Sequence, residues 1–560
     1  MRIFLLLLSL FLTLHATVPT DAQLKKMIGR MLIVGFDETY VEPTSQIVSD
    51  IQKYDLGGVI LFDRFYTDKQ RVKNILSPYQ LKKLTRHLQY FAHKPLFIAV
   101  DQEGGKVSRL KAKYGFLEIP SAAAVSCMPL QKAQQIYNAQ AQMLQNSGIN
   151  VNFAPVVDLS TNPKNKVIAG LERSYGSDPK EVAKYAQTMI DAQTRHNVLS
   201  VLKHFPGHGS SLGDSHKGFV DITNTWDKKE LEPYKILINA HKADAIMTAH
   251  VFNANLDDTY PATLSYKINT ELLRKQLHFQ GVIISDDMQM KAISANYSLK
   301  DAVTLAINAG VNILLFGNQL AYNSTKEIVE TIFKQVKSKK IPLSKIIESN
   351  ARIETLHVKS AIIQKPIIFG KKRKELTRAY IQKHYGLHVK NIQIQPKIIV
   401  LHWTAVMDVN NSFARLKPQK LLSDRKEIAK ASALNVSAHF LVDREGTVYQ
   451  LMPDNVMARH VIGLNYSSIG IENVGGEANK KEDLTPAQVR ANISLIKYLK
   501  QKYPDIRYLI GHYEYTKMQN NPLWLERDAG YRTQKADPGE LFMQEVRAGV
   551  QDLHLRGADE

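Results

Sequence analysis

Eight short apolar runs recur along the first part of the chain, and stretches with helical spacing of apolar residues separate them. Near-continuous runs of Val, Ile and Leu that alternate with helices are typical of a parallel sheet buried on both faces. Eight such units in about 300 residues predict a (β/α)8 barrel of the TIM type, with a doubly wound open sheet as the alternative. The runs are Met31–Phe36, Gly57–Phe62, Leu96–Asp101, Ile149–Ala154, Leu199–His204, Ala243–Thr248, Gly281–Asp286 and Val311–Phe316.

The pattern changes after Gln364. A basic stretch over residues 365–374, which contains a proline and a glycine, is expected to link two domains. A smaller mixed α/β domain is predicted over residues 375–560, behind a barrel domain over residues 23–364. Its expected elements are a helix near Glu375–His384, the strand Ile398–Thr404, a hairpin of Ala438–Val442 and Thr447–Met452, the strand Ser468–Val474, a helix over Pro486–Lys502 and the strand Tyr508–His512.

The first 22 residues have the pattern of a signal peptide. Met1-Arg2 give a basic start, Ile3–Leu14 is apolar, and the small residue Ala16 follows. The apolar run is too short to span a bilayer, which takes roughly 20 residues. We therefore expect an exported, periplasmic protein, with an extracellular location or an uncleaved anchor in the inner membrane as the alternatives.

The formal net charge is +20, and Cys127 is the single cysteine. One cysteine excludes a disulfide within the chain. A basic chain raises the question of nucleic-acid binding, but its lysines and arginines are dispersed, with one dense cluster at Lys371–Lys374. We expect no nucleic-acid partner, because an anionic wall polymer or membrane surface fits an exported basic protein better. The sequence carries no signal for an oligomeric state.

A loop rich in proton-binding groups follows the fifth apolar run. It contains Lys203 and His204, and then Asp214 and His216. Residues two apart in an extended segment point to the same side, so the Asp214 carboxylate can bond one nitrogen of His216 and raise the basicity of the other. A histidine held in this way is a suitable general acid/base. Asp286, which ends the seventh run, is a candidate nucleophile toward the anomeric carbon of a sugar.

Five motifs resemble glycoside hydrolase family 3, in particular its β-N-acetylglucosaminidase branch. They are Asp101–Gly105, Asn152–Asp158, Arg173–Gly176, Lys203–His216 and Ser285–Met288, and the resemblance covers roughly residues 22–364. It implies a retaining glycosidase without a cofactor, in which Asp286 is the nucleophile and His216 with Asp214 the acid/base pair. Asp287 is the rival nucleophile.

The same resemblance implies a set of sugar-binding residues, namely Asp101, Arg109, Arg173, Lys203, His204 and His250. It also leaves one reaction open. A neutral imidazole as acid/base would not repel phosphate, so phosphorolysis stays an alternative to hydrolysis.

Three scattered residues of the second domain form a candidate metal site. His402 lies within a predicted strand, His512 ends another, and Asp537 lies in a later loop. Two histidines and one aspartate leave a fourth position open, as in catalytic zinc sites. Zinc in such a site lowers the pKa of a bound water to about 7 and polarises a carbonyl group.

Six motifs resemble the type 2 N-acetylmuramoyl-L-alanine amidases, which include AmpD-like and peptidoglycan-recognition domains. They are Leu401–Ala405, Ser437–Phe440, Gly446–Leu451, Ser468–Glu472, Gly511-His512 and Lys535–Gly539, and the resemblance covers roughly residues 375–545. It implies Zn2+ on His402, His512 and Asp537. Glu472 would be the general base, Lys535 would stabilise the oxyanion, and His460 would lie on the substrate side. His439 is expected to be a bonded core residue instead.

Two positions depart from that family. Ala536 stands where the family usually has threonine, and the segment between His512 and Asp537 is longer than in compact members. Neither changes the ligand set.

Both resemblances point to peptidoglycan fragments as substrates. The first domain would remove β-1,4-linked N-acetylglucosamine from a muramyl residue, and the second would cut between the muramyl lactyl group and L-alanine. A peptidoglycan-binding protein with one or both sites silent is the alternative. The complete set of predicted ligands and acid/base residues favours an enzyme.

Overall fold

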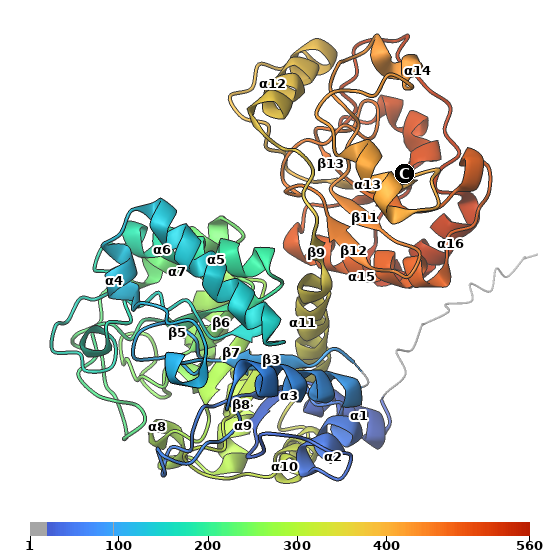
Figure 1. The fold of residues 1–560 in the computed structure, drawn as a ribbon. Coiled ribbons are helices and arrows are strands. Elements are labelled where there is room, and N and C mark those ends of the chain that lie inside the picture. The colour runs from blue at the N-terminus through green and yellow to red at the C-terminus, as the bar shows by residue number, and fades with distance from the viewer. Residues whose placement is uncertain (1–18, 93) are drawn as a thin grey trace, which may run out of the picture.

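The computed structural model describes residues 19–92 and 94–560, which form two domains joined by one long helix (Figure 1). Residues 1–18, which make up most of the expected signal peptide, lie outside the described residues. Within the two described ranges, no helix combines the length and the apolar character that crossing a membrane requires.

The first domain is a closed barrel of eight strands that neighbour one another in chain order. All strand pairs are parallel, and the barrel closes where Ile33 of β1 pairs with Leu315 of β8. Each predicted apolar run coincides with a strand to within a few residues at either end, so the (β/α)8 prediction is confirmed. The strands are β1 (Leu32–Gly35), β2 (Gly58–Ile60), β3 (Phe97–Val100), β4 (Val151–Asn152), β5 (Leu199–Phe205), β6 (Ala245–Thr248), β7 (Val282–Asp287) and β8 (Ile313–Phe316).

Helices cover the outside of the barrel, and local signals start several of them. Ser77 and Asp178 cap α3 and α6 through their side chains, and each is followed by a proline in the first turn. The barrel helices are α1 (Asp21–Gly29), α2 (Gln46–Tyr54), α3 (Pro78–Phe91), α4 (Ala122–Ser126), α5 (Leu130–Asn146), α6 (Pro179–Arg195), α7 (Glu232–Asn239), α8 (Lys291–Ser294), α9 (Leu299–Ala309), α10 (Thr325–Lys337) and α11 (Leu343–Ala361).

The second domain is built on a six-stranded mixed sheet in the order β14-β10-β13-β11-β12-β9. β10, the second strand from one edge, pairs in parallel with β13 and β14, whereas β11 and β12 form the predicted antiparallel hairpin. The strands are β9 (Ile363–Gln364), β10 (Ile398–Trp403), β11 (Phe440–Val442), β12 (Val448–Gln450), β13 (Ser468–Asn473) and β14 (Tyr508–Gly511). The helices are α12 (Lys371–Tyr380), α13 (Val409–Leu416), α14 (Lys426–Ala429), α15 (Pro486–Lys502) and α16 (Glu540–Gly549).

The connection between the domains belongs to the second sheet and is not a free linker. β9 follows α11 after one residue and pairs with β12 as the edge strand. The amides of Lys365 and Ile367 continue this pairing by donating to the carbonyls of Gln450 and Leu451. The stretch expected as a linker therefore extends the sheet, and its last residues begin α12. Apolar residues such as Ile367, which is buried, explain why it packs despite its basic composition.

The second domain contacts the barrel at the amino-terminal ends of the strands. α15 packs along α11, and the side chain of Gln501 donates to the carbonyl of Gln280, just before β7, over 2.8 Å. The rings of His241 and Tyr503 meet edge to face at 5.6 Å. A cavity of about 490 Å³ lies between the two surfaces. Active residues of such barrels lie at the other, carboxyl-terminal ends of the strands, so this contact leaves that end free.

We predict that the junction contributes to the stability of the second domain. Ile362 is 4% exposed and lies in that domain's core, whereas the next residue, Ile363, is 37% exposed. Ile362→Ala should lower the free energy of unfolding by about 2–4 kcal/mol through lost burial and a cavity. Ile363→Ala is the matched control and should cost less than about 1 kcal/mol. Chemical denaturation measures both, and equal effects of the two changes would contradict this role.

Candidate active sites

A cavity of about 420 Å³ opens at the carboxyl-terminal ends of the barrel strands, where the sequence predicts the first site. The structure brings eight of the predicted residues, and the rival Asp287, to its walls. They are Asp101, Arg109, Arg173, Lys203, His204, Asp214, His216 and Asp286. Lys203 and His204 belong to β5, every residue of which is buried, and Asp286 lies at the end of β7.

His250 is the one predicted sugar-binding residue that the structure does not bring to this cavity. It is 1% exposed, its Nε2 lies 2.9 Å from the carbonyl oxygen of Asp287, and its Nδ1 lies 2.8 Å from the hydroxyl of Thr263. Both ring nitrogens therefore have protein partners, and the ring supports the backbone of the strand end that carries Asp286.

Buried ion pairs position the cations of this cavity. Glu103 binds Arg173 through two hydrogen bonds of 2.7 Å and lies 2.8 Å from the Lys203 ammonium group. Asp101 binds the same lysine at 2.7 Å and lies 3.5 Å from Arg109. Burial raises the pKa of Glu103, but Arg173 and Lys203 outweigh burial and lower this pKa to about 2. Sequence reasoning missed Glu103, although it lies two residues after Asp101 in the same motif.

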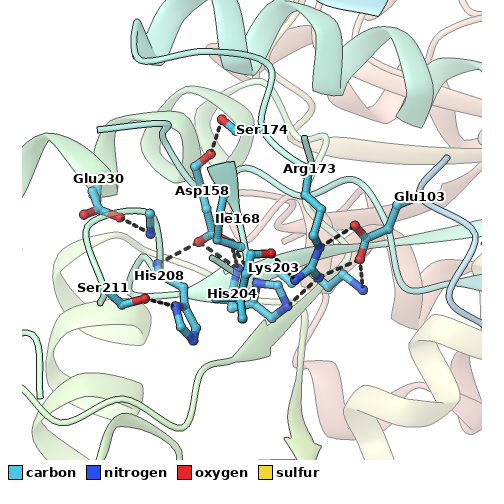
Figure 2. Close-up of polar contacts among 12 residues, drawn as sticks. Glu103, Asp158, Ile168, Arg173, Ser174, Lys203, His204, His208, Ser211 and Glu230 are labelled. Atoms are coloured by element: carbon cyan, nitrogen blue, oxygen red, sulfur yellow. Dashed lines mark hydrogen bonds and ion pairs between the residues drawn. The ribbon is translucent and has the colours of Figure 1, made fainter. Parts of the chain in front are cut away.

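A second carboxylate, Asp158, orients His204 (Figure 2). It accepts from the His204 backbone amide at 3.1 Å and lies 2.7 Å from Nδ1 of that ring, and it also accepts from the His208 amide at 2.8 Å. A proton on Nδ1 leaves Nε2 as the acceptor, and the Arg173 guanidinium lies 3.3 Å from Nε2. Asp158 was also missed as a functional residue, although it ends one of the five motifs.

The structure pairs Asp214 and His216 as the sequence predicts. The Asp214 carboxylate lies 2.9 Å from His216 Nδ1 and also accepts from the His216 amide at 3.0 Å. The His216 side chain is 49% exposed and lines the cavity, and its Nδ1 is the nitrogen that Asp214 binds. Asp214 and His216 lie in the loop after β5 and line the cavity from that loop.

The two adjacent carboxylates at the end of β7 have different surroundings. Asp287 accepts backbone hydrogen bonds from Gln289 and Gly317, and burial raises its pKa to about 6. Burial also raises the pKa of Asp286, but His250, His204 and His216 outweigh it and lower this pKa below its ordinary value. Asp286 is therefore the ionised carboxylate that faces the histidines, whereas Asp287 is tied to the wall.

The three predicted metal ligands of the second domain converge on one point. The Nδ1 atoms of His402 and His512 are 3.0 Å apart, and Asp537 Oδ2 lies 3.2 Å and 3.0 Å from them. Parallel β10 and β14 are neighbours, so their ends bring the two histidines together. Two imidazole nitrogens and one carboxylate oxygen at these separations fit a single zinc ion with an open fourth position.

The charge states of these ligands also fit a cation. Burial lowers the pKa of His512 to about 4, which leaves its imidazole neutral. Burial raises the pKa of Asp537, but His512 and His402 outweigh it and hold the pKa far below its ordinary value. A neutral imidazole and an ionised carboxylate are the forms that bind metals.

A chain of hydrogen bonds behind His402 fixes its orientation. The Ser468 hydroxyl donates to the Leu464 carbonyl at 2.8 Å, so its oxygen accepts from His460 Nε2 at 3.2 Å. His460 Nδ1 is then an acceptor and lies 3.0 Å from His402 Nε2. The proton of His402 is thereby held on Nε2, and Nδ1 offers its lone pair to a metal. His460 lines the cavity wall, but both of its nitrogens have protein partners.

Glu472 and Lys535 line the same cavity as the three ligands, which has a volume of about 510 Å³. Glu472 lies opposite His402 in the pairing of β13 with β10, so the two side chains project to the same face of the sheet. Burial raises the pKa of Glu472 to about 7, and its Oε2 has no hydrogen-bond partner among the described residues. A buried carboxylate with this pKa can take up and release a proton near neutral pH.

His439 is a bonded core residue, as the sequence predicts. Its ring is fully buried, its Nδ1 accepts from the Gly470 amide at 3.0 Å, and its Nε2 donates to the Val456 carbonyl at 2.8 Å. Both nitrogens are therefore used within the core.

Comparison with known protein families agrees with the two predicted domains. The family described as "Glycosyl hydrolase family 3 N terminal domain" matches residues 23–356, and the family described as "N-acetylmuramoyl-L-alanine amidase" matches residues 393–540. The chain therefore belongs to glycosyl hydrolase family 3 and carries an amidase domain behind its barrel. It is a glycosidase of the β-hexosaminidase type fused to an N-acetylmuramoyl-L-alanine amidase.

Individual relatives resemble the barrel part. The chain is 37% identical over 272 residues to a β-hexosaminidase of Tolumonas auensis, which corresponds to 48% of this chain and 77% of that protein. It is 34% identical over 335 residues to β-hexosaminidase A of Pseudoalteromonas piscicida, or 55% of this chain, and spans about half (54%) of that protein's length. The crystal structure of a β-N-acetylhexosaminidase from Beutenbergia cavernae is 26% identical and superposes with a TM-score of 0.54 over 60% of this chain and 98% of the other.

We predict that Glu103 positions the sugar-binding cations. Glu103→Gln would leave Arg173 and Lys203 without their shared buried anion, so the free energy of unfolding should fall by about 3 kcal/mol or more. The KM for a chromogenic N-acetylglucosaminide should rise at least roughly tenfold, because the displaced cations bind the sugar less well. The exposed Glu118→Gln serves as the control, and an unchanged KM in Glu103→Gln would argue against this role.

We predict that His460 sets the metal affinity of the second site. His460→Ala removes the acceptor that holds the proton of His402 on Nε2, and loss of such a partner typically weakens metal binding about 10- to 100-fold. Titration with Zn2+ against a competing chelator measures this affinity without activity. His460→Gln keeps an acceptor and should restore part of it, whereas wild-type affinity in His460→Ala would refute the interpretation.

Proposed function

We propose that the chain is a bifunctional peptidoglycan hydrolase that acts on muropeptides. The observation that carries the proposal is the presence of two complete sets of reactive groups in separate cavities. The barrel holds an ionised aspartate together with an Asp–His pair, and the second domain holds three convergent metal-binding atoms together with a buried glutamate and a lysine. N-acetylglucosamine and the amide between muramic acid and L-alanine occur side by side in one polymer, which unites the two domain types in one substrate.

In the glycosidase reaction, Asp286 attacks the anomeric carbon and forms a glycosyl-enzyme ester. His216, held by Asp214, donates its proton to the departing glycosidic oxygen. Water then hydrolyses the ester as His216 takes up the water's proton, so the anomeric configuration is retained. Asp101, Lys203, Arg173 and His204 hold the sugar hydroxyl groups through a network that Glu103 and Asp158 keep charged and oriented.

In the amidase reaction, His402, His512 and Asp537 would hold a zinc ion, which supplies a Lewis acid that polarises the amide carbonyl and makes water more acidic. Glu472 takes the proton of the attacking water and passes it to the departing amine of L-alanine. The Lys535 ammonium group lies in the same cavity and offsets the negative charge that develops on the carbonyl oxygen. The hydrogen bonds from Ser468 through His460 keep His402 in the orientation that binds metal.

The proposal includes export. The basic and apolar N-terminal sequence supports a periplasmic location, where both peptidoglycan and its fragments occur.

Two single substitutions separate the two reactions. Asp286→Ala should abolish release of N-acetylglucosamine from a GlcNAc–MurNAc–peptide fragment, by roughly 10³-fold or more, and should leave peptide release unchanged. His512→Ala, or a chelator, should abolish peptide release and leave sugar release unchanged. Mass spectrometry of the products measures both. A protein that binds the fragment but releases neither product would instead be a peptidoglycan-binding protein.

A further inference from the structure

Half of the net charge of the chain lies in one short stretch of the amidase domain. Residues 365–425 contain thirteen lysines and arginines against three acids, a net charge of +10 out of the total of +20. The stretch includes the basic cluster at Lys371–Lys374, which neither catalytic site uses.

One member of this cluster is a structural anchor. Arg373 is 1% exposed and donates to the carbonyls of Ile368 at 2.9 Å and Leu416 at 3.2 Å, and also to that of Pro418. Burial lowers its pKa to about 10, so it stays charged at neutral pH. Its bonds fasten the start of α12 to the loop after α13. That contact brings the cations of two separate segments together.

The neighbouring cations are displayed on the surface. Lys371, Lys374 and Arg378 are exposed at helical spacing on α12, and Lys417 and Lys420 are exposed on the adjoining loop. None of these five has an ion pair within the described part of the chain. Of the three acids in the stretch, Glu375 lies 4.0 Å from Lys372, Asp424 pairs with Arg415, and Asp408 caps α13. We call the five residues, together with Lys372, the cationic strip.

The cationic strip lies next to residues that line the amidase cavity. Tyr380, the last residue of α12, lines that cavity, and so do Arg415 and Leu416 from the segment that Arg373 fastens to the helix. Figure 1 shows α12 at the end of the second domain that is remote from the barrel. A large partner can therefore lie along the strip without meeting the glycosidase domain.

We propose that the cationic strip binds polymeric peptidoglycan through the carboxylates of its stem peptides and so holds the insoluble wall beside the amidase cavity. The inference rests on the proposed function and extends it to a substrate class. Each exposed cation alone contributes little, but a polymer carries a carboxylate-bearing peptide on successive muramyl residues and can engage several cations at once. A soluble fragment with one stem peptide occupies the cavity alone.

The composition of α12 favours a hydrophilic polymer over a lipid surface. Helices that lie on membranes present large apolar or aromatic side chains on the buried face. The exposed residues of α12 are Lys371, Lys372, Lys374, Arg378 and Ala379, and none of these is a large apolar residue.

The test compares two triple variants with equal loss of charge. Lys371→Gln/Lys372→Gln/Lys374→Gln removes three cations of the strip. Lys326→Gln/Lys334→Gln/Lys340→Gln removes three exposed lysines from the region of α10 on the barrel. Each protein is sedimented with purified sacculi in the presence of a chelator. The strip variant should bind roughly tenfold more weakly than wild type at low salt, with the difference lost near 0.5 M salt, where exposed charges are screened. The α10 variant should bind like wild type.

Peptide release from a soluble GlcNAc–MurNAc–peptide fragment separates this inference from the proposed function. We expect equal release by all three proteins, with only the strip variant slow on sacculi. Equal binding of sacculi by the strip variant and wild type would overturn the inference while leaving the amidase proposal intact. If wild type bound phosphatidylglycerol vesicles or DNA as tightly as sacculi, and the strip variant lost this binding too, the inference would be overturned in favour of a general polyanion surface. A wild-type protein that releases no peptide from the fragment would refute the proposed function instead.

Discussion

Hydrogen-bonded pairing between neighbouring parallel strands holds both active sites in place. In the barrel, β5, β6 and β7 are adjacent, so the groups at their ends surround one cavity although they lie far apart in the sequence. In the second sheet, the register of β10 with β13 places His402 opposite Glu472, and the pairing of β10 with β14 brings His512 alongside. A slip of one residue would turn each of these side chains to the opposite face.

Between the ends of these paired strands, buried charges and hydrogen bonds fix the charge state and the orientation of the reactive groups. Glu103 keeps two cations in the barrel cavity, Asp158 holds the proton of His204 on Nδ1, and the Ser468–His460 chain holds that of His402 on Nε2. In each case the partner is buried, and its other hydrogen bonds or its charge fix where the proton or the cation lies. Such preorganisation lets the site respond to developing charge without reorienting its dipoles.

The sequence predicted the barrel strands and α15 well, because their apolar runs and capping residues are local signals. It also predicted the residues that the structure gathers at the two cavities, through motifs at strand ends. It did not predict the burial of His250 and Arg373 or the anchoring role of Glu103, because those roles depend on partners distant in the chain. The sequence predicts a linker at the junction because the basic composition there gives no local signal for the pairing of β9 with β12.

The short connection from α11 into β9 has a consequence for how the two cavities are placed relative to each other. Only one residue separates α11 from the edge strand β9, and α15 packs along α11, so packed secondary structure joins the two domains in place of an extended linker. The amidase domain sits against the amino-terminal ends of the barrel strands, whereas the glycosidase cavity opens at the opposite ends. The two cavities therefore have separate openings, and a molecule that leaves one of them has to cross solvent before it can enter the other.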